Sequence, residues 1–216
     1  MKDNVKPKLE LISLFSTPVV KTNINRSFTK KEIDCIKSIP MTQRVDYTLK
    51  QGSQSQFFDV FDNVKTKEGL KDIKTFCEHE LKRYLKDIEG VDTDITTLQI
   101  TRSWVTKLNP QELHGLHNHR NSYLSGVLYF RCLPNDFIQF TNRNFLFDQS
   151  LELPKKKTTK FTAKIAKVNI KEGDFIIFSS YIPHEVVLNE TKDKQRISLG
   201  FDTWPTYLPS LYPPYK

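Results

Sequence analysis

The sequence is poor in cysteine, and its three cysteines lie far apart, at Cys35, Cys77 and Cys132. An odd number of cysteines argues against a disulfide framework, and their wide separation excludes a zinc ribbon, which needs closely spaced pairs. The opening segment, MKDNVKPKLELISLF, lacks the apolar block and the small-residue cleavage site of a signal peptide. These absences together predict a protein of a reducing cytoplasm.

Long apolar runs are missing as well. No stretch of the 216 residues approaches the roughly 18 uncharged apolar residues that a membrane-spanning helix needs, so we expect no membrane partner. Internal repeats, low-complexity tracts and Gly/Ser linkers are also lacking, which favours one structural domain. What the chain does contain is 15 Phe, 8 Tyr and 2 Trp, and this apolar material for a core excludes a disordered chain.

The positive charge is unevenly distributed. The net charge is +8, and the lysine-rich segment, Lys155–Lys171, carries seven lysines and no acidic residue. Such a segment is either a solvated loop and strand edge kept soluble by lysine, or a surface that attracts an anionic partner. Only one aromatic residue, Phe161, lies within it, whereas surfaces that bind single-stranded nucleic acid interleave aromatic and basic side chains. We therefore favour the solvated edge and regard an anionic partner as a weak indication.

Two helices are predicted within residues 1–94. Thr29 followed by Glu32 three residues later is the pattern of a capping box and predicts a helix start. From Leu70 to Ile88 apolar residues recur at steps of three and four, and Gly90 ends the pattern, as in an amphipathic helix. The opposite side of this helix is rich in Lys, Asp and Glu. It also carries His79, which we interpret as a surface residue.

After Gly90 the composition changes to β-branched and aromatic residues, which favour strands. The predicted strands are residues 95–108, 123–132, 137–141, 161–170, 175–179, 185–188 and 196–204, with an earlier one at 11–20. This number and spacing of short strands is typical of a β-sandwich or small barrel, with the second helix as a buttress on one sheet. The fold class predicted is mostly β with flanking helices.

We expect three segments within one structural domain. Residues 1–94 supply a strand and helices that pack on the core, residues 95–204 form the β core, and residues 205–216 form a proline-rich tail. The tail either folds back or docks a second subunit, so a homodimer stays open. Its apolar residues are Tyr207, Leu208, Leu211, Tyr212 and Tyr215.

Three of the five histidines fall within six positions, in the segment HGLHNHR. If this segment is extended at the mouth of a strand, His117 and His119 point to the same side and can chelate one transition metal. His184 starts a later predicted strand and is available as a third ligand. A three-ligand site of this kind leaves positions open for substrate and oxygen, a pattern associated with non-haem Fe(II). The alternative is that these histidines are loop residues satisfied by hydrogen bonds.

An arginine in a late predicted strand is a candidate anion-binding residue. Arg196 begins the segment RISLGFD, in which Ile197, Leu199 and Phe201 alternate with Ser198 and Gly200. Arg196 and Ser198 therefore share a face, which this alternation allows to be the barrel interior. A buried guanidinium is costly unless it pairs with an anion, and the carboxylate of a small molecule would be such a partner. The alternative is an arginine at a sheet edge with its guanidinium in water.

The order of three motifs resembles a known superfamily. HNHRNSYLSGVLYF, then EGDFIIFSSYIPHEV, then QRISLGFD is similar to the double-stranded β-helix (a jelly-roll or cupin-like core) of the Fe(II)/2-oxoglutarate-dependent oxygenases. More narrowly, the chain resembles a bacterial and phage family with the signature HxHxNSxxSGVxY preceded by a Ser-Trp strand, here Ser103-Trp104. The similarity covers about residues 95–203, and the opening LFSTPV also looks like the family's start. If the gene is carried by a phage, the expected location is the host cytoplasm.

The resemblance implies a cofactor site residue by residue. Fe(II), 2-oxoglutarate and O2 are the implied cofactor and cosubstrates. Arg196 would hold the far carboxylate of 2-oxoglutarate with Ser198 beside it, and Tyr129 matches a position where related prolyl-hydroxylase-like enzymes place a hydroxyl on that carboxylate. The implied metal ligands are His117, His119 and His184.

One departure from the superfamily pattern concerns the second ligand. The superfamily usually has His-x-Asp or His-x-Glu, whereas here the third position of the motif is His119. Either the site uses three histidines, or one of the pair is not a ligand and His114 or Glu112 takes its place. An imidazole instead of a carboxylate leaves the iron site one unit more positive, which should change its redox properties.

The function implied is oxygenation, with hydroxylation as the default outcome, on a substrate that the sequence does not identify. A small molecule, a protein side chain and a nucleobase all stay open. One alternative is a three-histidine metal dioxygenase that does not use 2-oxoglutarate and does not need Arg196. Another is a non-catalytic β-barrel binding module that holds a metal, for which a closed four-coordinate zinc site would be the sign.

Overall fold

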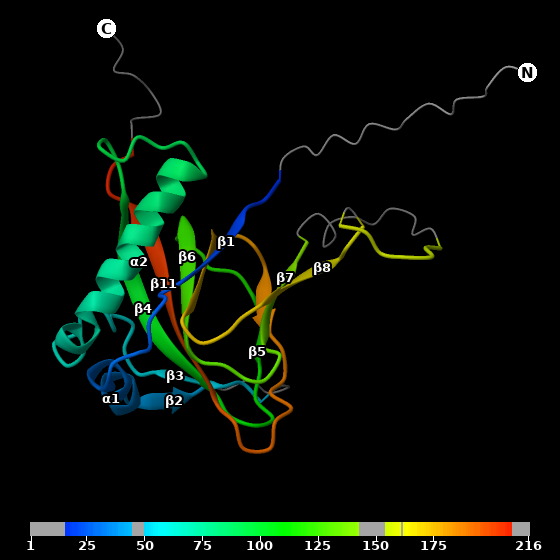
Figure 1. Ribbon diagram of the computed structural model, residues 1–216, viewed down its shortest axis with the longest axis horizontal. Coiled ribbons are helices and arrows are strands. Elements are labelled where there is room, and N and C mark those ends of the chain that lie inside the picture. Colours follow the sequence, from blue (N-terminus) through cyan, green and yellow to red (C-terminus); the bar gives the residue numbers. More distant parts are fainter. Residues whose placement is uncertain (1–15, 45–49, 143–153, 161, 209–216) are drawn as a thin grey trace, which may run out of the picture.

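The computed structural model describes residues 16–44, 50–142, 154–160 and 162–208 of the chain. Within these residues eleven strands form two antiparallel sheets, flanked by two helices (Figure 1). The helices are α1 (Lys30–Ser38) and α2 (Lys67–Asp87). The strands are β1 (Val19–Asn23), β2 (Met41–Gln43), β3 (Ser53–Ser55), β4 (Leu98–Leu108), β5 (His114–His117), β6 (Leu124–Arg131), β7 (Phe137–Thr141), β8 (Ile165–Asn169), β9 (Asp174–Ser179), β10 (His184–Val186) and β11 (Arg196–Pro205). This confirms the mostly β fold with flanking helices.

The larger sheet has seven strands in the order β1-β9-β6-β11-β4-β3-β2. The N-terminal region supplies both of its edges, because β1 pairs with β9 on one side and β3 pairs with β4 on the other. Strand β1 begins directly after Pro18, which has no N–H to donate to a ladder, so it lies later than the predicted 11–20. Residues 11–15 of that prediction lie outside the described part of the chain.

The smaller sheet has the order β5-β10-β7-β8 and forms the second layer of the sandwich. Strand β7 agrees with its predicted bounds, and β8 begins later than predicted, at Ile165. Three strands were not predicted from the sequence: β5, which is four residues long, and β2 and β3, which have three each. All three lack a run of β-branched residues and form through pairing with neighbouring strands: β3 with β4, β2 with β3, and β5 with β10.

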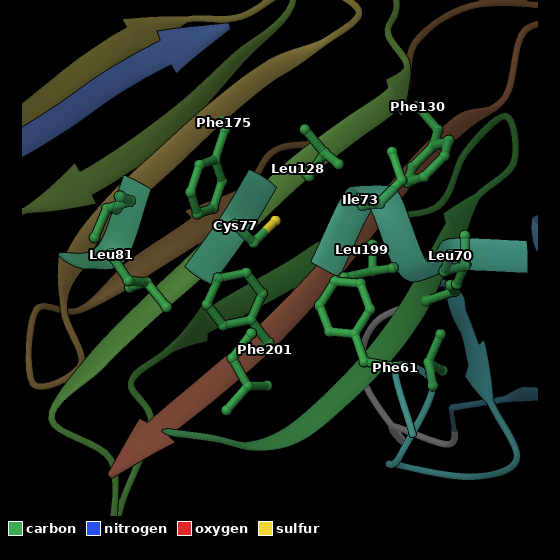
Figure 2. Packing of buried hydrophobic residues seen from close by; sticks show 14 of the residues in the cluster. Phe61, Leu70, Ile73, Cys77, Leu81, Leu128, Phe130, Phe175, Leu199 and Phe201 are labelled. Atoms are coloured by element: carbon green, nitrogen blue, oxygen red, sulfur yellow. The ribbon is translucent and has the colours of Figure 1, made fainter. Parts of the chain in front are cut away.

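Both predicted helices are present. Thr29 caps α1 with a complete capping box to Glu32, and Gly90, at φ 68°, follows the end of α2. Helix α2 lies across the outer face of the large sheet, and its apolar side packs against strand residues such as Phe175 and Phe201 (Figures 1 and 2). Neither helix is long and apolar enough to span a membrane within the described residues.

The large sheet has two different faces, and β11 shows the alternation clearly. Leu199 and Phe201 belong to the cluster beneath α2, whereas Gly200 faces the other way and lies against the indole of Trp104. A Cβ at Gly200 would lie 2.9 Å from that ring, so any larger residue at this position would displace the Trp104 side chain. A second apolar cluster, which includes Tyr129 and Phe178, lies between the two sheets. The candidate site lies in this interior layer.

Candidate metal centre

Strand pairing brings the three predicted metal ligands together. His117 ends β5, His119 follows two residues later, and His184 starts β10, where it pairs directly with His117. One ring nitrogen of each lies within 4.8 Å of the others. Among the residues that the structure describes, this is the cluster of side chains suited to hold a metal ion. The extended geometry predicted for the His-Asn-His segment places both of its imidazoles on the same side.

Hydrogen bonds show which nitrogen of each ring is free. Nδ1 of His117 lies 2.7 Å from the carbonyl oxygen of Gly115, and Nδ1 of His184 lies 3.0 Å from that of Ile182. Nδ1 of His119 lies 2.6 Å from a carboxylate oxygen. Because carbonyl and carboxylate oxygens only accept, each Nδ1 must carry the proton. Nε2 is therefore the nitrogen of each ring that remains for a metal.

Burial favours the neutral imidazole in His117 and His184. Burial lowers the pKa of His117 to about 4. Burial lowers the pKa of His184 well below its ordinary value, and the neighbouring His117 and His119 lower it further. A metal ion binds only the neutral imidazole, so in both residues the environment favours the form that binds metal.

The carboxylate bonded to His119 belongs to Asp202, near the end of β11. Asp202 is buried, and its Oδ1 accepts hydrogen bonds from His119 Nδ1 at 2.6 Å and from the Ser125 hydroxyl at 3.0 Å. Ser125 also contacts the Ser180 hydroxyl at 2.8 Å. A carboxylate that accepts from the outer nitrogen of a metal-binding histidine fixes the ring and makes it a stronger donor.

An open pocket of about 440 Å³ leads to this cluster. His117 and His119 form part of its wall, together with the aromatic rings of Phe58 and Trp104. Trp104 packs against His119 with ring centroids 5.4 Å apart. A pocket of this size accommodates a small molecule, a single side chain or a base.

Arg196 lies in the interior, as its alternation with apolar residues predicts, and it has a partner that the sequence did not reveal. Its Nε donates to Asp136 Oδ2 at 2.7 Å, and its Nη2 forms a close ion pair with Asp136 Oδ1. Both side chains are only 2% exposed. The pairing uses two of the three guanidinium nitrogens, and Nη1 has no hydrogen-bond partner among the residues that the structure describes.

Tyr129 has a second unpaired donor in the same interior. Its hydroxyl is buried and has no hydrogen-bond partner within the described part of the chain. Burial raises its pKa well above the ordinary value, while the charge of Arg196 opposes that rise. Ser198, half-buried, lies directly across from Tyr129 in the pairing of β11 with β6. Buried donors without a partner are rare in proteins, and an acceptor such as a carboxylate would satisfy both.

The interior anion site and the histidine cluster lie along one strand. Nη2 of Arg196 is 3.5 Å from the carbonyl oxygen of Phe137, at the start of β7, whereas His184 pairs with Phe140. Phe137 and Phe140 are three residues apart along β7, which is about 10 Å. An arginine side chain and a five-carbon dicarboxylate together can cover that distance, so the residues present fit both Fe(II) and 2-oxoglutarate.

The alternative ligands take other roles. Nε2 of His114 pairs closely with the guanidinium of Arg44, and its ring stacks on His117 at 4.2 Å. Glu112 instead accepts from the backbone and side chain of Asn109, closing the turn between β4 and β5. The fifth histidine, His79, lies exposed on α2, as predicted.

Asp136, Asp202 and Ser125 were not identified from the sequence. Asp202 lies in the segment RISLGFD and shares the alternation that places Arg196 inside, so the same pattern could have drawn attention to it. Asp136 lies in the turn Leu133-Pro-Asn-Asp, where an aspartate usually caps the turn, and it does accept from the N–H of Leu133. No local signal distinguishes it from any other turn aspartate.

Comparison with known proteins agrees with this site. Residues 102–202 match a family model described as "Putative 2OG-Fe(II) oxygenase". The matched segment contains the three histidines, Arg196 and Tyr129. No curated protein sequence matches the chain.

Solved structures with the same fold share little sequence. An oxidoreductase of the 2OG-Fe(II) oxygenase family from Burkholderia pseudomallei aligns with TM-score 0.59 and 13% identity, over 86% of this chain and 84% of its own. HygX from Streptomyces hygroscopicus, solved with nickel and 2-oxoglutarate, aligns with TM-score 0.57 and 10% identity, over 88% and 84%. A prolyl-4-hydroxylase from Pseudomonas putida aligns with TM-score 0.50 and 15% identity, over 87% and 93%.

The family match and the interior site agree on one class of protein. The match spans the strands that carry the histidine cluster and the buried arginine, and the solved structures share the two-sheet fold. Residues 102–202, just under half of the chain, are thus similar to the 2OG-Fe(II) oxygenases, and the whole described chain shares their fold.

Proposed function

We propose that the protein is a hydroxylase that oxidises a C–H bond of a substrate bound in the open pocket. The observation that carries this proposal is the pair of buried, unpartnered donors, Arg196 Nη1 and Tyr129 Oη, in the interior that also holds the histidine cluster. The fold that the chain shares with a prolyl-4-hydroxylase supports the same reaction type. When bound, the iron and 2-oxoglutarate supply the activation of O2.

The three histidines would hold the metal through Nε2. Their Nδ1 atoms are already occupied by hydrogen bonds, so each ring is held in one tautomer and one orientation. Three ligands on one face leave the remaining positions of an octahedral ion open for cosubstrate and oxygen. A structural zinc site would instead need a fourth protein ligand, and the described cluster has three members.

Arg196 and Tyr129 would hold the far carboxylate of 2-oxoglutarate, with Ser198 beside them. A guanidinium nitrogen and a phenol hydroxyl are both donors, and a carboxylate supplies the acceptors that both lack. A three-histidine dioxygenase without 2-oxoglutarate would have no use for either group. Leaving both donors unpaired in the interior costs free energy, so their presence favours the 2-oxoglutarate enzyme.

Asp202 would compensate for the missing carboxylate ligand. In this chain His119 stands where the superfamily usually has Asp or Glu, and a neutral ligand leaves the iron site more positive. The Asp202 carboxylate lies one hydrogen bond beyond that position, 2.6 Å from His119 Nδ1. It returns negative charge to the site through the imidazole, which is how an outer carboxylate tunes a metal.

The test is anaerobic titration with Fe(II) followed by 2-oxoglutarate, watching for the weak visible charge-transfer band of the chelated complex. We expect the band in the wild-type protein and its loss in His184→Ala. His79→Ala is the matched control, because His79 lies on α2, away from the cluster.

The role of Arg196 is tested in a variant that also removes the charge of its partner, Asp136. Arg196→Gln alone would leave Asp136 buried and unpaired, so the informative variant is Arg196→Gln combined with Asp136→Asn. We expect this double variant to bind Fe(II) normally and to need far more 2-oxoglutarate to develop the band. Tight metal binding with no band in the wild type would support a dioxygenase without 2-oxoglutarate or a metal-holding module. Absence of metal binding would overturn the proposal.

A further inference from the structure

The mouth of the open pocket is strongly cationic. Arg44, Arg102 and Arg120 line it, and among the described residues of its lining Asp202 alone is acidic. Asp202 is buried, accepts a hydrogen bond from His119 and lies 3.8 Å from Arg102, so one carboxylate faces three guanidinium groups. The proposed hydroxylation needs no positive charge here, because the cosubstrate is held by the interior arginine.

Two aromatic rings hold the guanidinium of Arg102 in place. Its guanidinium lies over the ring of Phe58 at 5.1 Å and over that of Trp104 at 5.7 Å. Its Nη1 is 3.8 Å from Asp202 Oδ2, and the side chain is 54% exposed. Stacking on aromatic rings limits the motion of the guanidinium while leaving edge N–H groups for a ligand, so less entropy is lost on binding.

Arg120 adds a second charge that nothing in the described residues neutralises. It is exposed, lies on the pocket wall directly after His119, and forms no hydrogen bond or ion pair within the part of the chain that the structure describes. Arg44, in contrast, contacts His114. An unpaired arginine next to a proposed metal ligand is thus available to bind a substrate.

We propose that the substrate carries an oxyanion, phosphate or carboxylate, which Arg102 and Arg120 bind at the pocket mouth while the carbon to be oxidised faces the histidine cluster. This rests on the proposed function. Two guanidinium groups match an oxyanion because each offers paired N–H donors in a planar fork. The chemistry is shared by phosphorylated and carboxylated substrates, so the test separates the two.

The lysine-rich segment contributes positive charge near the pocket. The N–H of Thr141 donates to the carbonyl of Pro183, directly before His184, and the N–H of Asn142 donates to the carbonyl of Lys164. Lys164 therefore lies at the same end of the smaller sheet as the histidine cluster. The charge of Lys164 at this end adds to the positive potential that attracts anions toward the pocket.

The experiment measures ligand binding to the metal-free protein, without 2-oxoglutarate. Trp104 lies in the pocket wall, so its fluorescence reports occupancy, and Trp204→Phe removes the second, exposed indole as a background change. The probes are phenyl phosphate, benzoate and the neutral benzamide, which share one ring and differ in charge. We expect one or both anions to change the fluorescence saturably and benzamide not to do so.

Three substitutions test which arginines bind the anionic probe. Arg102→Gln and Arg120→Gln should each weaken anion binding about tenfold or more, the usual effect of losing a charged hydrogen-bond donor. Arg120→Gln is the cleaner variant, because its side chain has no described partner to disturb. Arg83→Gln is the control: this arginine lies on α2 and pairs with Glu80, remote from the pocket.

Each outcome decides something. Binding of phenyl phosphate alone would identify a phosphorylated substrate, and binding of benzoate alone a carboxylated one. Equal binding of benzamide, no binding of either anion, or anion binding unchanged in Arg120→Gln would overturn the inference. Because the measurement uses no iron, its result is independent of the charge-transfer test, and failure of one is distinguishable from failure of the other.

Discussion

His119 and Asp202 are joined by a 2.6 Å hydrogen bond from Nδ1 to a buried carboxylate oxygen. We predict that Asp202→Asn weakens metal binding about 10- to 100-fold, the usual effect of removing such an outer partner. Competitive titration of Co(II) with a chromophoric chelator measures this directly. Asp193→Asn, on an exposed loop, is the control. Unchanged Co(II) affinity in Asp202→Asn would show that His119 needs no carboxylate.

Arg196 and Asp136 form a buried pair, and breaking it should be costly. We predict that Asp136→Asn lowers the free energy of unfolding by about 3–5 kcal/mol, because Arg196 would remain charged with no anion beside it. Replacing both residues, Asp136→Leu with Arg196→Met, should recover most of that loss. Urea denaturation followed by circular dichroism measures both. A cost below about 1 kcal/mol for the single variant would contradict the pairing.

Gly126, within the Ser-Gly-Val segment of β6, has no room for a side chain. A Cβ there would lie 2.3 Å from the ring of Phe201 and 2.8 Å from that of Phe175. We predict that Gly126→Ala destabilises the fold by about 1–3 kcal/mol, because two buried rings must shift. A thermal melt would show this as a lower Tm. An unchanged Tm would mean that the rings beneath α2 are packed more loosely than the structure shows.

The buried histidines predict a pH dependence for the metal-free protein. Burial lowers the pKa of His117 from the ordinary 6.5 to about 4, and it lowers the pKa of His184 and His114 in the same direction. Between these values the unfolded chain binds more protons than the folded one, so stability falls as the pH is lowered from about 6.5 toward 4. The slope should approach about 1.4 kcal/mol per pH unit for each titrating histidine.

Urea denaturation at several pH values checks this, with His117→Gln as the comparison. The variant should show a shallower slope, because glutamine does not titrate. A stability that is flat between pH 4 and 6.5 would rule out burial of neutral imidazoles. Saturating Zn(II) should steepen the dependence in the wild type, since metal and protons compete for the same nitrogens.

Local sequence signals predicted the elements that they fully specify. The capping box at Thr29 and the apolar spacing of α2 need no distant residues to be recognised, and the structure contains both helices. Strands β2, β3 and β5 escaped prediction because each has only three or four residues and depends on pairing with a strand distant in the sequence or equally short. Their existence follows from sheet pairing, which local propensity does not encode.

The sequence by itself determined the chemical identity of the site: the His-x-His spacing, a remote histidine, and an interior arginine set by strand alternation. Only the tertiary structure decided their partners. Asp202 lies 83 residues from His119, and Asp136 lies 60 residues before Arg196. Contacts at such separations arise from the pairing of strands across two sheets, whereas alternation within one strand fixes only the face on which a side chain lies.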